Sequence, residues 1–197
     1  NKIKKILIGT NNVGKYKEIC NLLPKKIKKY SLKEFDILAP KETGKTFREN
    51  SFIKASYFSK KTNLICLSDD SGLEIDLLGG KPGIYSSRWS GEKNNFDLAI
   101  RRVFEEMNNI KEDWTRENIA KFTCCMTLYW PDGKNFSTQG IVKGKISTVK
   151  KGKNGFGYDP IFIPDGYNQT FAEMMPDKKM SIDHRFKAFH KIKNFFI

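Results

Sequence analysis

Two adjacent aspartates, Asp69 and Asp70, are the side chains of this 197-residue sequence best suited to holding a cation. They follow the apolar segment Leu64 to Leu67 and precede Ser71 and Gly72. Neighbouring carboxylates repel one another, and a cation beside them compensates for this repulsion. Ligands that are all oxygen favour magnesium or manganese over zinc, and a carboxylate that does not saturate the ion could orient a water. A turn in which one aspartate caps the backbone is the alternative interpretation.

A glycine-bounded loop at residues 9–15 is the second candidate for chemistry. Its sequence, Gly-Thr-Asn-Asn-Val-Gly-Lys, has the spacing of a phosphate-binding loop. That motif continues with a serine or threonine whose hydroxyl reaches magnesium, whereas Tyr16 stands here. Backbone N–H groups at a helix start, two asparagines and Lys15 could still bind a triphosphate. A plain turn with Lys15 in solvent is the other possibility.

The elements that must position these residues alternate between strands and helices. Ile3 to Ile8 is typical of a buried strand, and Gly9 to Gly14 of a polar turn. A helix should follow and end before Pro24, which cannot continue it. A second helix is predicted from Thr46 to Lys60, leading into the apolar strand before the two aspartates. The pair should therefore lie just past a strand's carboxyl end, where α/β sheets commonly bind ligands.

The second half of the chain adds one strong helix and one hairpin. Apolar residues from Phe96 to Met107 recur at helical spacing, which predicts an amphipathic packing helix. Lys121 to Trp130 alternates with period two, and Pro131-Asp132-Gly133 should turn the chain into a second strand from Phe136 to Val142. These patterns predict an α/β protein with a mixed sheet, and residues 1–197 suffice for a single domain.

Composition narrows the class of protein. Hydrophobic residues make up 39% of the chain, which is typical of a globular protein. The net charge of +14, from 36 basic and 22 acidic residues, would attract phosphorylated ligands or nucleic acid. Biased genome composition would produce the same lysine excess, so we expect no specific nucleic-acid partner. The rival hypotheses are a P-loop type NTPase that releases orthophosphate, against which Tyr16 argues, and a basic nucleic-acid-binding protein without catalysis.

The sequence also constrains the cellular compartment of the protein and the redox state of its cysteines. No run of about 18 apolar residues could span a membrane, so we expect a cytoplasmic protein with no membrane partner. The four cysteines, Cys20, Cys66, Cys124 and Cys125, lack the spacing of a zinc site or a disulfide framework. We expect them to be reduced and buried.

Five motifs, read in order, resemble the inosine/xanthosine triphosphate pyrophosphatase family. They are Thr10 to Lys15, Ser68 to Leu73, Gly79 to Arg88, Gly155 to Pro160, and Ile182 to Arg185. Glu42-Thr43-Gly44 with Phe47 to Lys54 adds a sixth stretch, so the resemblance covers nearly the whole chain. Two positions depart from the pattern: Asn11, where many relatives have glycine, and Asp183, where serine is usual.

The resemblance implies a magnesium-dependent enzyme that cleaves between the α- and β-phosphates of ITP, dITP and XTP, with manganese as a possible substitute. The products would be a nucleoside monophosphate and pyrophosphate. It implies an elongated mixed β-sheet with two α/β lobes around a central substrate cleft, paired as a homodimer. Removal of deaminated purines from the nucleotide pool would be the role of such an enzyme.

The resemblance also assigns residues to the triphosphate and the metal. Glu42 and Asp70 match the metal-binding acids, and Asp70 also matches the proton acceptor. Asp69 would support it, and Lys54 would neutralise phosphate charge. Ser71 would contact the substrate. The loop that would cradle the triphosphate consists of Thr10, Asn11, Asn12, Val13, Gly14 and Lys15.

A third group matches the residues that bind the purine. The base-pocket motif is Phe156, Gly157, Tyr158 and Asp159, in which an aromatic ring would stack on the base. Lys179, His184 and Arg185 match donors near the purine, and donors aimed at a 6-oxo group are left unpaired by the amino group of ATP. From the residues alone, the aromatics could equally be core residues, Lys179 a solvated lysine and His184 a helix cap.

Overall fold

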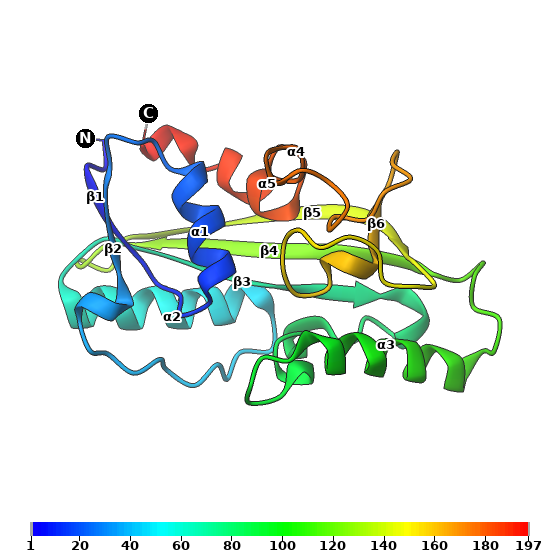
Figure 1. The fold of residues 1–197 in the computed structure, drawn as a ribbon. Coiled ribbons are helices and arrows are strands. Elements are labelled where there is room, and N and C mark those ends of the chain that lie inside the picture. The colour runs from blue at the N-terminus through cyan, green and yellow to red at the C-terminus, as the bar shows by residue number, and fades with distance from the viewer. Residues whose placement is uncertain (1, 197) are drawn as a thin grey trace. The chain divides into compact units, whose positions relative to one another are not determined.

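The computed structural model describes residues 2–196, and Figure 1 shows the order of its elements. The strands are β1 (Lys5–Ile8), β2 (Lys28–Ser31), β3 (Cys66–Ile75), β4 (Ile119–Tyr129), β5 (Asn135–Ile146) and β6 (Phe162–Pro164). The α-helices are α1 (Val13–Leu22), α2 (Phe47–Thr62), α3 (Phe96–Ile110), α4 (Pro176–Met180) and α5 (His184–His190). No helix within residues 2–196 is long and apolar enough to cross a membrane.

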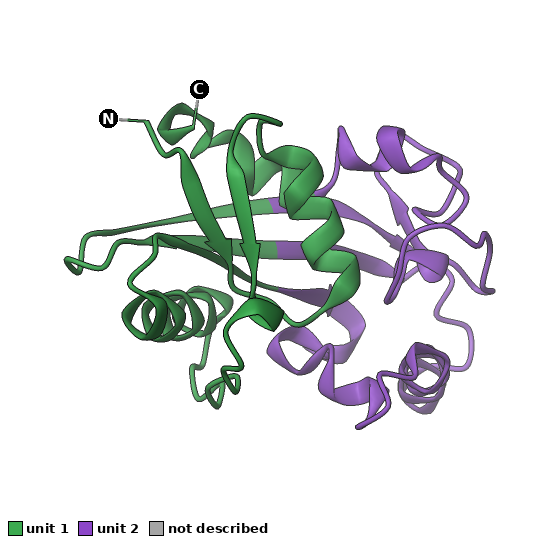
Figure 2. Cartoon of the chain, turned by 60° about the vertical axis from the view of Figure 1, so that its left-hand side comes forward, with its two compact units in different colours: residues 1–70, 124–140, 184–197 green, residues 71–123, 141–183 purple. Residues whose placement is uncertain are grey.

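The chain divides into two compact units, coloured separately in Figure 2. Unit 1 comprises residues 1–70, 124–140 and 184–197, and unit 2 comprises residues 71–123 and 141–183. The boundaries fall inside β3, β4 and β5, so these three strands contribute residues to both units. Two α/β units agree with the two lobes that the resemblance implies.

The strands form a mixed sheet in the order β2-β1-β3-β4-β5-β6. β1 is parallel to β2 and to β3, with Leu7 opposite Cys66 and Ile8 opposite Leu67. β5 is antiparallel to β6. Parallel strands require crossover connections, and helices α1 and α2 supply them here. The predicted α/β class and mixed sheet are confirmed.

Local sequence accounts well for the start of the longer helices. The Thr46 hydroxyl accepts from the backbone N–H of Glu49 at 3.1 Å, which caps α2. The Asn95 side chain caps α3 in the same way, through the N–H of Asp97. The apolar stripe of α3 is buried as predicted, because Ala99, Ile100, Val103 and Met107 all face the core.

Each unit has its own hydrophobic core. In unit 2, α3 packs with Leu73, Phe122, Phe162 and Phe171. Unit 1 has a core between α1, α5 and the strands, which includes Cys124 and Met126 of β4. A further cluster in unit 1 includes Cys66. Cys66, Cys124 and Cys125 are buried and Cys20 is partly buried, and all four are free thiols.

Two predicted boundaries beside the candidate site were wrong. Asp69 and Asp70 lie inside β3 rather than beyond its end, because tertiary contacts hold several polar residues of that strand. Ser68, for example, donates its hydroxyl to the carbonyl of Gly9 at 3.1 Å. The aspartates instead follow the level at which the parallel neighbour β1 ends, since Ile8 is opposite Leu67. Helix α1 also begins at Val13, so the polar turn is shorter than predicted.

Candidate active site

Asp69 is fully buried in unit 1, and its two carboxylate oxygens have different surroundings. Oδ2 lies 3.2 Å from the ammonium of Lys15 and accepts from Nη2 of Arg185 at 3.1 Å. Oδ1 has no hydrogen-bond partner within residues 2–196. Burial alone would raise the pKa of this carboxyl, but Lys15, Arg185 and Lys54 outweigh burial and hold the pKa below its usual range. Asp69 is therefore ionised at neutral pH, with one oxygen anchored.

Asp70 has the opposite electrostatic balance. Its Oδ1 lies 3.7 Å from the ammonium of Lys54, which also contacts Glu42 at 2.9 Å. Burial raises the pKa of Asp70, and the charges of Glu42 and Asp69 add to this effect against the opposing lysines. Burial would lower the pKa of Lys54, but the surrounding acids outweigh it and raise that pKa. Two adjacent carboxyls with diverging pKa values suit separate roles in acid–base chemistry.

Arg185 links Asp69 to a second acid that the sequence did not indicate. Its side chain is 2% exposed, and its Nη1 donates to Glu18 on α1 while Nε and Nη2 point at Asp69. Glu18 stands three residues after Lys15, on the same face of that helix. The helical spacing from Lys15 is the signal that could have identified Glu18. His184, the preceding residue on α5, is also buried.

The glycine loop combines capping with an exposed surface. The Asn12 side chain accepts from the N–H of Lys15 at 2.9 Å, and Thr10 accepts from the N–H of Asn12 at 3.2 Å. Asn11 and Val13 are exposed, while Gly14 and Lys15 are partly buried. Capping by Asn12 directs the start of α1 so that Lys15 reaches Asp69. The loop therefore supplies the cation next to the acid pair.

The carboxylate oxygens in unit 1 are suitable ligands for a magnesium ion that also binds phosphate oxygens. Asp70 Oδ2 and Asp69 Oδ1 are both buried without a hydrogen-bond partner in the described part of the chain. No three acidic, histidine or cysteine side chains within residues 2–196 are grouped so that they could hold a metal. Magnesium commonly uses only one or two protein carboxylates and completes its shell with water and phosphate oxygens. Glu42 and Asp70, which share Lys54, provide that number.

In unit 2, the sequence-predicted base-pocket residues form a second cluster. The ammonium of Lys179 on α4 lies 2.7 Å from Oδ2 of Asp159, and both side chains are buried. The same ammonium lies 5.0 Å from the ring centre of Phe156. The backbone N–H of Phe156 also donates to Asp159, at 3.0 Å. Asp159 thus orients both Lys179 and the segment that carries Phe156.

The other residues of the segment from Gly155 to Asp159 also make structural contacts. Tyr158 belongs to the unit 2 core, donates its hydroxyl to the carbonyl of Ser86 at 2.7 Å and packs edge-on against Phe96. Gly155 has φ +72°, and a Cβ there would lie 2.1 Å from the Asp159 carboxylate. Gly157 also has positive φ. Ser71, within β3, is the residue next to Asp70 and is partly buried.

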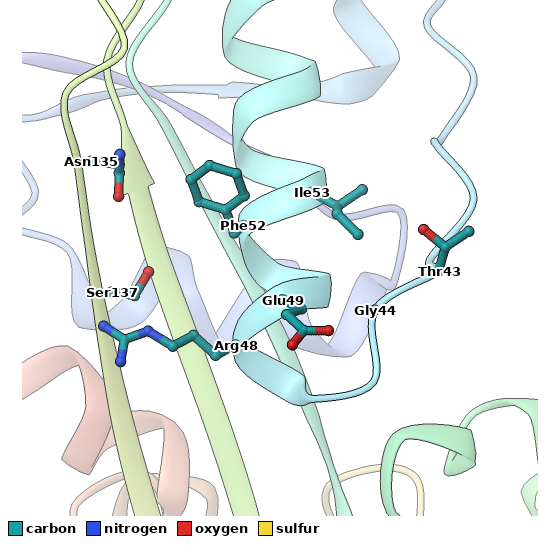
Figure 3. Close-up of a pocket in the computed structure, with 8 residues that line it drawn as sticks. All are labelled: Thr43, Gly44, Arg48, Glu49, Phe52, Ile53, Asn135 and Ser137. Carbon is teal, nitrogen blue, oxygen red and sulfur yellow. The ribbon is translucent and has the colours of Figure 1, made fainter.

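A separate cavity of about 460 Å³ lies in unit 1, beside α2 and β5. Figure 3 shows Phe52 and Ile53 projecting from α2, with Asn135 and Ser137 on the neighbouring strand. The loop residues Thr43 and Gly44 also line it. None of the sequence-predicted site residues lines this cavity, although Thr43 directly follows Glu42.

Comparison with known proteins agrees with the residue pattern. A sequence model of the Ham1 family matches residues 6–195. A protein of Rhodospirillum centenum named dITP/XTP pyrophosphatase is 40% identical over 188 residues, which are 95% of this chain and 92% of that protein. A protein of Bacillus cereus with the same name is 38% identical over 194 residues, covering 96% of this chain and 93% of that protein.

Solved structures give the same grouping. A HAM1 protein from Coxiella burnetii has a TM-score of 0.87 and 34% identity, with 98% of each chain covered. A nucleoside-triphosphatase/dITP/XTP pyrophosphatase from Mycobacterium abscessus has a TM-score of 0.76 and 34% identity, covering 95% of this chain and 98% of that one. The sequence and structural similarities therefore extend over almost the whole chain.

Proposed function

Because the chain belongs to the Ham1 family, we propose that it hydrolyses ITP, dITP and XTP to the nucleoside monophosphate and pyrophosphate. The observation that carries this proposal is the acid pair of unit 1. Asp69 and Asp70 are buried beside Lys15 and Lys54, so anionic and cationic groups alternate where a triphosphate and its counterion need both. Such an enzyme would remove deaminated purines from the nucleotide pool.

Unit 1 supplies the residues for the phosphates. Lys15 and Lys54 offset the charge that develops on the pyrophosphate leaving group, aided by the positive amino-terminal end of α1 that follows the loop. Both lysines lie beside carboxylates in the protein, so they are oriented before the substrate binds. Their charges favour the transition state, in which negative charge moves onto the leaving oxygen.

Asp70 is the group that accepts the proton. It orients a water whose oxygen bonds to the α-phosphorus while the bond from that phosphorus to the bridging oxygen breaks. The electron pair of the broken bond leaves with pyrophosphate, and the proton of the water passes to Asp70. The position of Asp70 beside Lys54 and Asp69, and its match to the proton acceptor of the family, support this role. Asp69, which keeps its charge, supports Asp70.

A separate set of residues is proposed for the base. Phe156 stacks on the purine, and Lys179 donates toward its 6-oxo group, with the Lys179 ammonium directed by Asp159. His184 and Arg185 are further donors in the proposal, carried by their match to the family pattern. Arg185 also holds Asp69, so it has an electrostatic role besides the proposed base contact.

Three further parts of the proposal rest on the resemblance and on the chemistry of the donors. Magnesium, or manganese in its place, would be held by Glu42 and Asp70 and would neutralise phosphate charge during the reaction. The enzyme would be a homodimer, which light scattering during gel filtration measures directly. It would act in the cytoplasm, where deaminated nucleoside triphosphates would otherwise be used by polymerases.

Product identification tests the proposed function. The protein is incubated with magnesium and each of inosine, xanthosine, guanosine and adenosine triphosphates, and the products are separated by ion chromatography. Pyrophosphate from the first two, with little from ATP and none after addition of a chelator, is the expected result. Orthophosphate with a nucleoside diphosphate would show a different NTPase reaction. Intact ITP with salt-sensitive nucleic-acid binding would support a binding protein instead.

A further inference from the structure

The side-chain amide of Asn50 on α2 is fully buried, and only its oxygen has a hydrogen-bond partner within residues 2–196. Its exposed fraction is 0%, and its Oδ1 accepts from the backbone N–H of Gly44 at 2.8 Å. Its Nδ2 is also buried and has no hydrogen-bond partner within residues 2–196. Buried amide donors are nearly always hydrogen-bonded in folded proteins. We therefore expect this N–H₂ group to donate to an acceptor on a bound ligand.

The orientation of the Asn50 amide is fixed by its neighbour. A rotation that exchanged oxygen and nitrogen would set two donors, Nδ2 and the Gly44 N–H, against each other. Gly44 is also packed closely against this amide, because a Cβ at that position would lie 2.6 Å from Oδ1 of Asn50. The nitrogen therefore points away from the loop that Oδ1 holds.

The place of Asn50 in unit 1 indicates what the acceptor is. Asn50 precedes Lys54 by four residues, so the two side chains share one face of the helix. Lys54 contacts Glu42 and Asp70, and the loop held by Asn50 carries Glu42 two residues before Gly44. Asp70 Oδ2 also lacks a partner in the described residues, so it does not satisfy this donor. The acceptor for Asn50 Nδ2 is therefore expected to lie next to the Lys54 ammonium.

We propose that Nδ2 of Asn50 donates to a phosphate oxygen of the bound nucleoside triphosphate, while Oδ1 holds the segment that carries Glu42. A side-chain N–H₂ group only donates, so a metal cation cannot be its partner and an anionic oxygen can. Asn50 is thus a substrate-binding residue beyond those that the family pattern assigned. The inference rests on the triphosphate hydrolysis proposed above.

Binding of an unreactive substrate analogue tests the role of Asn50. The probe is inosine triphosphate with an imido group in place of the α,β-bridging oxygen, titrated calorimetrically with and without magnesium. Asn50→Asp keeps the acceptor for Gly44 and removes the donor, and Asn50→Ala removes both without adding a charge. Loss of a hydrogen bond to a charged group predicts a Kd about 10- to 100-fold weaker in both variants, with or without magnesium.

A matched control separates binding from stability. The Nδ2 of Asn118 in unit 2 donates to the carbonyl of Ile146 at 2.9 Å, so Asn118→Asp removes a paired amide of the same kind. This control should lower the melting temperature and leave the analogue Kd within about twofold of wild type. It shows what the loss of a purely structural amide does.

The outcomes distinguish this inference from the proposed function. A folded Asn50→Asp or Asn50→Ala protein with a Kd within about twofold of wild type refutes the role of Asn50, and the amide then has a structural water as its partner. If Asn50→Asp does not fold, the Kd of Asn50→Ala decides. Wild-type protein that releases no pyrophosphate from ITP refutes the proposed function and this inference with it. Normal wild-type turnover with unchanged Kd in the variants refutes the inference alone.

Discussion

Substitution of Arg185 by methionine should destabilise the protein strongly, because it removes the cation that two acids share. Arg185 contacts Asp69 and Glu18, and its side chain is almost fully buried. Methionine fills a similar volume without charge, so the change isolates the electrostatic role. Asp69 keeps Lys15, but its carboxylate loses two of the donors that hold Oδ2.

The expected loss of stability follows from the burial of the Arg185–Asp69 ion pair. Removing one partner of a buried ion pair costs about 3–5 kcal/mol, because a charge is left in a poorly solvated place. For a chain of this size, 1 kcal/mol shifts the melting temperature by about 2–4 °C, so a fall of roughly 6–20 °C is expected. Replacing an exposed partner should cost much less, about 0–1 kcal/mol.

Urea unfolding followed by circular dichroism measures the difference, with Lys111→Met as the matched control. Lys111 pairs with Glu117 on the surface, where its side chain is 46% exposed. Adding Asp69→Asn to Arg185→Met should restore part of the lost stability, because the uncompensated charge disappears. An Arg185→Met protein no less stable than Lys111→Met would show that the buried network is not what holds this region together.

Three further predictions concern the two acid clusters. Asp70→Asn should reduce kcat by about 10²- to 10⁴-fold in a pyrophosphate-release assay, as expected for loss of a general base, and should raise stability at pH 7, since this carboxyl has a raised pKa. Lys179→Met should cost about 3–5 kcal/mol in urea unfolding because Asp159 loses its buried partner, and the preference for ITP over ATP should fall. The pKa of Asp69 is lower in the folded protein than its unfolded value of about 3.9, so the stability it contributes is present above that pH and lost as the pH falls further. Acid titration of wild type and Asp69→Asn, followed by circular dichroism, should show that loss only in wild type.

Sequence reasoning succeeded where local patterns and tertiary demands agree. Helix α3 was predicted because its apolar residues recur at the helical period, and it buries that face. Helix α2 was predicted from Thr46 to Lys60 and runs from Phe47 to Thr62, and Thr46 caps its amino-terminal end. The length of β3 was underestimated because a run of aspartate, serine and glycine has no strand-like pattern of its own. Some of its polar side chains are held by residues far away in the chain, as Ser68 is by Gly9 and Asp69 by Arg185.

In the candidate site too, some residues could be predicted from the sequence and others could not. Asp69, Asp70, Lys15, Lys54 and Glu42 were identified from the sequence, and unit 1 brings all five together. Glu18 and Asn50 were not singled out, because only the three-residue spacing from Lys15 marks Glu18 and nothing marks Asn50 until its partner is known. Their partners, Arg185 and Gly44, are 167 and 6 residues away in the chain.

The sequence by itself determined the α/β class, the family and the residues that could bind a triphosphate, because these depend on residue types and their spacing. Only the tertiary structure decided how the two aspartates differ. Adjacent carboxyls have nearly the same intrinsic pKa, and Lys15 and Lys54 lower the pKa of both, so the opposite shifts arise because Arg185 acts on Asp69 and Glu42 on Asp70. Arg185 and Lys15 keep Asp69 ionised, while burial and neighbouring acids raise the pKa of Asp70.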